Sequence, residues 1–497
     1  MGILDIFKRD YQAEQKPQRR SKRSYKAASS GRLFADFTSS SNSADSELRY
    51  SLELMRNRSR ELVRDNEFAR RYINLLKTNI VGETGFHLQV KARNDDGSLD
   101  AAGNTIIENA FKSWGRMGNP TVDGRLSWLD CQRYAIEALA RDGEVFIKKM
   151  SGRNFRDNFA LQFIEADLVD HKKNETLPNG NQIRMGVELD RYHRPVAYWI
   201  LQSHPGDRFQ YSAGSQKHIR VPADEIIHVY MPTRTHQTRG EPFMSSVITS
   251  LKMMAGYRDS EITAARIGAS KMGILTTPTG DDFVGNDLED DIVPVIDVEP
   301  GTFHQLPAGY NLDMFDPNHP NTGFAEFESA LLRGIASGLN VSYASLSNDL
   351  SSVNYSSIRQ GALDERDGYR MLHQFMIQHF IDPVFRDWLM SAMDFGGIPI
   401  PSSKFDKFAD NASFRGRGWQ WVDPVKEINA AVVGLNNGIM SMQDVAGHYG
   451  RDVEETFNQI ARDKEIADQF GIKTAFEPFG AKFPTDAIVE GGDDGEI

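Results

Sequence analysis

The sequence has very little cysteine: Cys131 is the one cysteine among 497 residues. A single thiol cannot form an internal disulfide or a multi-cysteine zinc site, so a stapled scaffold is excluded and the composition fits a reducing compartment. Long apolar runs are also missing. No stretch approaches the roughly 20 apolar residues that a membrane-spanning helix needs, and the mean hydropathy is -0.48. We therefore expect no membrane-spanning segment.

The motifs of common enzymes are missing as well. The chain has no G-x-x-x-x-G-K-[ST] sequence for nucleotide phosphates and no H-E-x-x-H pair for zinc. The segment Gly268–Met272 departs from the G-x-S-x-G nucleophile turn at its last position, which is methionine. These absences predict that the protein is not an enzyme and needs no cofactor or metal ion.

Charge is distributed unevenly along the chain, whose net formal charge is -12. Residues 1–45 are basic and polar, so they are expected to form a disordered tail. Such a tail is either simply solvated or in contact with DNA or an acidic scaffold. Residues 272–332 are the opposite, because they contain no Lys or Arg and carry a cluster of four carboxylates: Asp287, Glu289, Asp290 and Asp291.

Hydrophobic periodicity predicts an α+β fold with several domains. A helical period runs from Leu48 to Leu76 and is expected to end at Gly82, and strand-like alternation begins at Phe86. A helix is expected near residues 128–141, followed by strands of an antiparallel or mixed sheet. Further helices are expected at residues 244–271, about 40 Å long, and at residues 358–381, after which Asp382 and Pro383 predict a cap and a new helix.

The most informative segment joins a helix to a serine-rich stretch. Apolar residues three or four apart predict one face of a helix over residues 324–341, and Gly334 and Gly338 thin its surface so that a neighbour can approach closely. Residues 342–357 then contain seven serines and two asparagines. Because these residues compete with helical hydrogen bonds, the stretch predicts a mobile loop.

Four motifs stand out along the chain. In order they are GEVF at Gly143–Phe146, IIHVYMPTRTHQTRGEPF at Ile226–Phe243, LLRGIASGLNVSYASLS with NYSSIR within residues 331–359, and GRGWQWVDPVKE at Gly416–Glu427. Together they resemble the portal proteins of tailed bacteriophages, specifically the lambda-type family. The matching order extends over roughly residues 56–438, so the resemblance covers most of the chain and not one segment.

The resemblance implies a portal fold with an α/β wing body, a two-helix stem, a small β-containing clip, a channel loop and a helical crown-like region. On this interpretation the chain divides, in order, into a basic tail (1–45), the wing (46–243), the first stem helix (244–271), the clip (272–323), the second stem helix (324–341), the channel or tunnel loop (342–357), a long helix with the rest of the wing (358–422), the crown-like region (423–470) and an acidic flexible tail (471–497).

The resemblance also implies a function and its partners. It predicts a homo-oligomeric ring of twelve subunits at one capsid vertex of the virion, assembled in the host cytoplasm, which seeds the procapsid and conducts double-stranded DNA during packaging and ejection. The implied partners are the terminase large subunit, the major capsid and scaffolding proteins, and head-completion or adaptor proteins. Two alternatives remain: a minor capsid or head-tail adaptor protein, or a DNA-packaging enzyme.

Site residues follow from the same interpretation. The four clustered carboxylates of the clip would dock the packaging motor, and Leu331, Gly334, Ile335 and Gly338 would pack the stem. Arg333 and Arg359 would contact either DNA or acidic groups of a neighbouring subunit. A channel should hold phosphates weakly, because each Lys or Arg contact adds sequence-independent binding. The loop residues expected to face DNA are Leu346, Ser347, Asn348, Asp349, Leu350, Ser351, Ser352, Asn354 and Tyr355.

Overall fold

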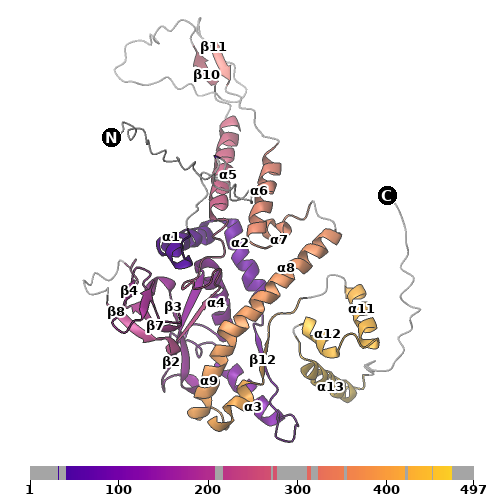
Figure 1. The fold of residues 1–497 in the computed structure, drawn as a ribbon. Coiled ribbons are helices and arrows are strands. Elements are labelled where there is room, and N and C mark those ends of the chain that lie inside the picture. Colours follow the sequence, from indigo (N-terminus) through magenta and orange to yellow (C-terminus); the bar gives the residue numbers. More distant parts are fainter. Residues whose placement is uncertain are drawn as a thin grey trace, which may run out of the picture.

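The computed structural model describes residue 32 and residues 41–207, 217–269, 273–276, 311–314, 323–351, 355–419, 424–449 and 451–472. A body of helices and sheets carries a projecting pair of helices at one end and a group of three helices at its side (Figure 1). The mixture of helix and sheet agrees with the expected class. The basic N-terminal stretch before residue 41, apart from Arg32, and the four clustered carboxylates lie outside the described residues.

The chain enters the body through two capped helices, α1 (Ala44–Asp65) and α2 (Glu67–Leu76). The Ser43 hydroxyl accepts a hydrogen bond from the first turn of α1, and the Asn66 side chain does the same for α2, as helix N-termini require. A π-helical turn, η3 (Lys77–Val81), follows α2. It ends at Gly82, whose φ of 68° favours glycine, so the predicted end of this helical region is confirmed.

Two antiparallel sheets form most of the strand content. The first has the order β3-β2-β9 and the second the order β4-β5-β6-β7-β8. The sequence predicted an antiparallel or mixed sheet, and every pairing within these two sheets is antiparallel. A separate pair, β1 with β12, joins an early and a late part of the chain. The strands are β1 (His87–Val90), β2 (Glu144–Ser151), β3 (Phe159–Ile164), β4 (Glu175–Thr176), β5 (Gln182–Arg184), β6 (Val187–Leu189), β7 (Pro195–Leu201), β8 (His218–Pro222), β9 (Ile226–Tyr230) and β12 (Ala412–Arg415).

The main hydrophobic core lies between the helices and the three-stranded sheet. The predicted helix near residue 128 is confirmed as α4 (Trp128–Asp142), which begins with a capping box between Ser127 and Asp130 and carries the buried Cys131. Aromatic rings fill the centre, with Phe111 of α3 (Ala101–Trp114) 4.9 Å from Trp388, centroid to centroid. Burial raises the pKa of the Cys131 thiol, which makes a reactive thiolate unfavourable there.

A nearly continuous helix crosses the body. Its parts are α8 (Tyr355–Met376), the π-helical η7 (Ile377–Ile381) and α9 (Asp382–Asp394), after which α10 (Phe405–Ala409) follows. The predicted helix does begin at this point, with Pro383 in its first turn. The prediction that Asp382 caps it is wrong, because Ile381 and Asp382 both have helical dihedral angles. Pro383 cannot donate to the preceding turn, and the wider turn of η7 lies where that bond is lost.

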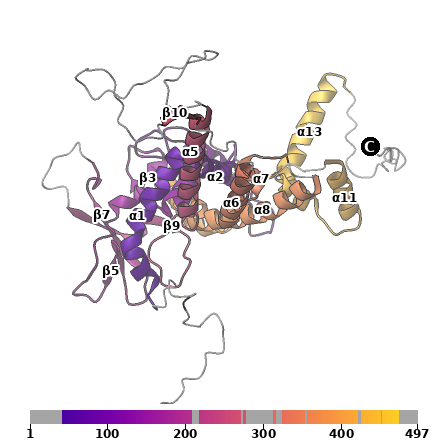
Figure 2. The same cartoon turned by 90° about the horizontal axis from the view of Figure 1, so that it is seen from above.

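The projecting pair consists of α5 (Ile248–Ala269) and α6 (Phe324–Gly338). Beyond them, β10 (Gly273–Thr276) and β11 (Asn311–Met314) pair as antiparallel strands. The group at the side of the body contains α11 (Pro424–Asn436), α12 (Met442–His448) and α13 (Val453–Gln469), and Figure 2 shows it displaced from the sheets along α8. Among the helices in these ranges, none has both the length and the apolar character that a bilayer crossing requires.

The serine-rich stretch is only partly irregular. A short helix, α7 (Tyr343–Ser347), forms inside it, with the Ser342 side chain as its cap, and ends at Asn348 in a left-handed conformation. The helix α8 begins at Tyr355 rather than at the expected residue 358. The prediction of a loop over residues 342–357 is therefore wrong at both ends. The Ser342 cap and the burial of Leu346, which is 2 % exposed, outweigh the weak helix propensity of serine.

Candidate functional site

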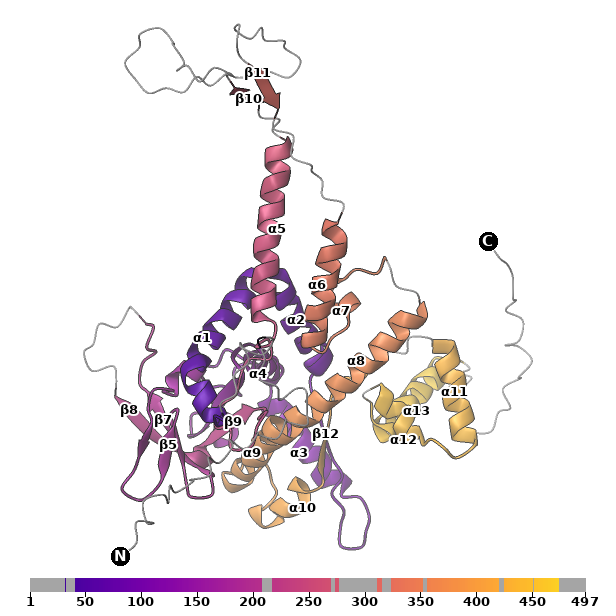
Figure 3. The same ribbon diagram turned by 45° about the horizontal axis from the view of Figure 1, so that its top comes forward.

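The projecting helices α5 and α6 are held together by rings and by charge. The Tyr257 ring stacks on Phe324 with centroids 5.7 Å apart and meets Phe327 edge to face at 5.2 Å. Near the base, Arg258 forms an ion pair of 3.0 Å with Glu328 on α6 and a second pair with Glu67 on α2. The same arginine therefore ties the two projecting helices to each other and to the body. Figure 3 shows the two helices side by side where they leave the body.

The two glycines of α6 have different surroundings. A Cβ added at Gly338 would lie 2.5 Å from the Cγ1 of Val247, so the chain leading into α5 approaches closely only because this residue is glycine. No atom lies within 4 Å of the equivalent position at Gly334. Ile335 is buried, and Leu331 packs half-buried on the core. Three of the four predicted packing residues thus have their contacts inside the subunit, and Gly334 lies on an open face.

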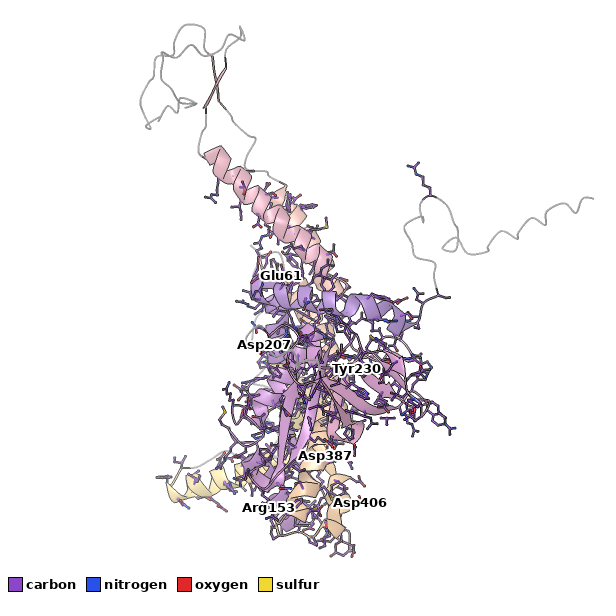
Figure 4. All side chains as sticks on the ribbon, turned by 90° about the vertical axis from the view of Figure 1, so that its left-hand side faces the viewer. Glu61, Arg153, Asp207, Tyr230, Asp387 and Asp406 are labelled. Carbon is purple, nitrogen blue, oxygen red and sulfur yellow. The ribbon has the colours of Figure 1, made fainter. Side chains whose placement is uncertain are left out.

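Large apolar side chains are exposed on both helices of the pair. Met253 and Ile262 of α5 are 71 % and 57 % exposed, and Phe327 of α6 is 49 % exposed. Met253 and Ile262 are nine residues apart, so they lie on opposite sides of α5. Figure 4 shows the side chains of α5 standing clear of the body. Exposed apolar side chains of this size are typical of surfaces that bind another chain.

Polar contacts fix the first half of the serine-rich stretch to the body. The hydroxyls of Ser342 and Ser345 donate to Glu365 of α8 at 3.3 and 2.8 Å. Arg71 of α2 donates to the Ser345 carbonyl oxygen at 3.0 Å. Leu346 is buried beneath these contacts, so the expectation that its side chain faces DNA is wrong for this conformation.

The second half of the stretch is an exposed turn. Asn348 adopts a φ of 58°, and Leu350 is 60 % exposed. Asp349 accepts hydrogen bonds from the amide and the hydroxyl of Ser351 and from the Tyr343 hydroxyl. The Ser351 contacts and then the Tyr343 hydroxyl hold the pKa of Asp349 below its ordinary value. Ser352 and Asn354, together with the side chain of Tyr355, lie outside the described residues.

The two arginines that flank the stretch lie in different environments. The exposed Arg333 places its guanidinium 5.1 Å above the centre of the Tyr343 ring. The Nη2 atom of Arg359 lies 3.7 Å from a carboxylate oxygen of Glu427 on α11. Arg359 therefore pairs within its own chain, whereas the two expected partners were DNA and a neighbouring subunit.

The first two motifs meet in a buried charge cluster. Glu144 of β2 accepts hydrogen bonds from Arg239 at 2.9 Å, from Arg56 at 2.6 Å and from His228 at 3.0 Å, and all four side chains are buried. Burial opposes ionisation of Glu144, but the two arginines and His228 hold its pKa well below the ordinary value. Burial lowers the pKa of His228. The ring is therefore neutral at pH 7 and donates its N–H to the carboxylate.

Close backbone packing accompanies this cluster. Tyr230, labelled in Figure 4 at the end of β9, is the register partner of Glu144. A Cβ added at Gly240 would collide with the carbonyl oxygen of Gly143, so both motif glycines are needed where the two segments cross. The remaining guanidinium donors of Arg239 bind main-chain carbonyl oxygens. The sequence motifs did not reveal that Glu144 and Arg239 form a buried ion pair. The visible signal for it was the glycine next to each of these two residues, Gly143 and Gly240.

One group of side chains in the described ranges has ligand atoms close enough for a metal ion: Glu165, Asp167 and His204. Its carboxylates already have cationic partners. Asp167 pairs with Arg56 and Arg60, and Glu165 lies 3.4 Å from Arg60. Because guanidinium groups already neutralise both carboxylates, this arrangement is better described as an ion-pair network than as a metal site.

Comparison with known proteins gives consistent names. The family described as "Phage portal protein, lambda family" matches residues 30–373. The "Probable portal protein" of Halomonas phage phiHAP-1 is 35 % identical over 474 residues, covering 94 % of this chain and 90 % of that protein. The "Portal protein" of Escherichia phage N15 is 24 % identical over 467 residues, covering 85 % and 86 %. A chain in the solved "Virion of native gene transfer agent (GTA) particle" is 12 % identical with a TM-score of 0.43, covering 81 % and 93 %.

Proposed function

Because this chain belongs to the lambda family of phage portal proteins, we propose that twelve copies form a ring at one capsid vertex and that the genome passes through it. The observation that carries this proposal is the projecting pair α5 and α6, which exposes Met253, Ile262 and Phe327. A single subunit cannot bury these side chains, and those of α5 point to opposite sides of the helix. Identical subunits joined head to tail around an axis can bury them, because each pair then has a neighbour on both sides, and such contacts close into a ring when the rotation permits.

The division of the chain is part of this proposal. The helices α5 and α6 form the stem, the residues between them form the clip, and the sheets with their helices form the wing. The group α11 to α13 forms the crown-like region. The ring assembles in the host cytoplasm together with scaffolding and major capsid proteins, and head-completion proteins later bind to it.

The exposed turn from Asn348 to Ser351 is the proposed channel-facing element. Its groups are neutral or acidic, so it touches passing DNA without gripping phosphates. Arg333, exposed at its edge and stacked on Tyr343, is the nearest candidate for a weak phosphate contact. The buried first half of the stretch anchors this turn to the body through Glu365 and Arg71.

The clip is the proposed docking site of the terminase large subunit. The four carboxylates from Asp287 to Asp291 lie in a stretch without Lys or Arg, so they would meet a basic surface of the motor. Exposed charges of this kind raise the association rate more than they raise the affinity.

Ring assembly is tested by the mass of the purified chain. We expect multi-angle light scattering to give a particle of several hundred kilodaltons, since one chain is 55.9 kDa. A mass of one chain at all micromolar concentrations would contradict the proposal and would favour a minor capsid or adaptor role.

A further inference from the structure

A deep cleft separates the group α11 to α13 from the body. Its volume is about 1470 Å³, which exceeds the ~300–1,000 Å³ of ordinary small-molecule pockets. One wall comes from η3, the turn after it and the strap at residues 415–419. The opposite wall is one face of α13, with Glu455, Gln459 and Asp463 on successive turns. The cleft is therefore long enough for a segment of polypeptide.

The body wall of the cleft is basic. It carries five cationic side chains and one carboxylate, that of Glu83; the cations are Lys77, Arg133, Arg366, Arg415 and Arg417. Two of them have acidic partners, because Lys77 pairs with Glu137 and Arg415 pairs with Asp452. Arg417 donates to the Thr78 carbonyl oxygen, and Arg133 donates to the carbonyl oxygens of Gly82 and Glu83. Because these acceptors are neutral, neither of these arginines forms an ion pair through these hydrogen bonds.

The strap packs Trp419 between η3 and side chains of α8. Trp419 donates to Asn79 of η3 at 3.1 Å, and its ring lies beneath the guanidinium of Arg370 at 5.7 Å and stacks on His373 at 5.4 Å. Burial lowers the pKa of Arg366, and the charges of Arg370 and Arg417 lower it further, while the carboxylate of Glu427 opposes this shift. The arginines are thus crowded together on a rigid aromatic support.

The helix α13 is attached to the body at its first residues. Asp452, which caps α13, pairs with Lys91 and Arg415. Farther along, Glu455 and Asp463 form no ion pair with the wall within the part of the chain that the structure describes. The cleft is therefore held at one end and remains open along the rest of the helix.

We propose that the acidic segment after α13, residues 484–497, binds in this cleft against the basic wall. It carries five carboxylates and no Lys or Arg, so its charge complements the wall. The last helical residue that lines the cleft is Asp463, and the described chain ends nine residues later, at Ile472. The return path of roughly 14 Å is short, because the eleven residues 473–483 can span up to about 36 Å.

The test uses the full chain and a variant in which the five carboxylates of the segment become amides: Asp486→Asn, Glu490→Gln, Asp493→Asn, Asp494→Asn and Glu496→Gln. These changes lie outside the folded body and leave its packing intact. Amide hydrogen exchange should be about tenfold slower at the strap and at residues 78–83 in the natural chain than in the variant. The difference should vanish near 1 M salt, where charges are screened within about 3 Å.

Two further arms identify the occupant. A labelled peptide of residues 484–497 should bind the variant, whose cleft is vacated, at least several-fold more tightly than the natural chain. Arg133→Gln with Arg417→Gln should abolish that binding. Arg191→Gln, which changes an exposed arginine in the turn between β6 and β7, should not. The matched control for the segment is amide substitution of the four clip carboxylates, which should leave exchange at the strap unchanged.

Three results would overturn this proposal. Equal exchange in the natural chain and the variant at low salt would remove the segment from the cleft. Protection that disappears on dilution would assign the cleft to the segment of another copy. Binding of a short DNA duplex to the natural chain that requires Arg133 and Arg417 would make the wall a nucleic-acid site. None of these outcomes bears on whether the chain forms rings.

Discussion

Two glycines on one helix allow a matched test of how the stem packs. Gly338→Ala places a methyl group 2.5 Å from Val247 Cγ1, whereas Gly334→Ala meets no atom within 4 Å. Overpacking a tight contact costs about 1–3 kcal/mol. Replacing glycine by alanine within a helix stabilises the helix by roughly 0.5–1 kcal/mol. The gain is smaller at Gly338, because it is the last residue of α6. We therefore expect a net loss of about 1 kcal/mol at Gly338 and a gain of up to 1 kcal/mol at Gly334.

Hydrogen exchange of the α6 amides measures both changes directly, since local opening free energies set the exchange rates. A loss of 1 kcal/mol corresponds to roughly fivefold faster exchange in Gly338→Ala, and Gly334→Ala should exchange more slowly. A larger residue extends the test, because Gly334→Leu should leave the isolated stem intact while disturbing ring formation. Equal effects of alanine at the two positions would refute the packing account, and intact rings in Gly334→Leu would remove this face from the subunit interface.

Three other predictions address the channel, the clip and the buried cluster. Lysines at Asn348 and Ser351 should slow DNA packaging without affecting ring formation, because about two dozen cations per twelvefold ring would face one phosphate charge per ~1.7 Å of duplex; packaging at the normal rate would contradict a channel-facing turn. Amide substitution of the four clip carboxylates should slow terminase association in low salt by surface plasmon resonance, and an unchanged rate would leave the clip without this role. The free energy of unfolding should fall as the pH drops below about 6.5. In the unfolded chain His228 gains a proton there, whereas its lowered pKa keeps it neutral in the folded protein. The melting temperature of His228→Gln should therefore decrease less between about pH 7.5 and 5.5 than that of the natural chain.

Much of the fold could be predicted from local patterns. The helix near Trp128 has a capping box in its sequence, and strand-like alternation of apolar and polar residues begins at Phe86, directly before β1. Glycine is typical of positions where a helix ends with a positive φ, and Gly82 and Gly438 both have such angles in the structure. These features depend on residues that are adjacent in the chain, so the sequence displays them directly.

The errors have a common physical origin in contacts between distant segments. Ser342 and Ser345 are serines that favour a loop, yet Glu365 and the buried Leu346 stabilise a helical turn. Arg359 finds its partner 68 positions away, in Glu427. The basic cleft combines Arg133 with Arg417, which no local pattern brings together. Sequence periodicity describes which faces of an element are apolar, but not which distant charges share a surface.

Identical subunits arranged around an axis should cover the exposed apolar side chains of α5 and α6. Negative-stain electron microscopy of the purified chain shows whether they do. We predict closed rings with a central hole, which reduce to smaller, open species when Met253 and Phe327 are replaced by Glu. Dispersed single subunits in the natural chain, or intact rings in the variant, would contradict the account.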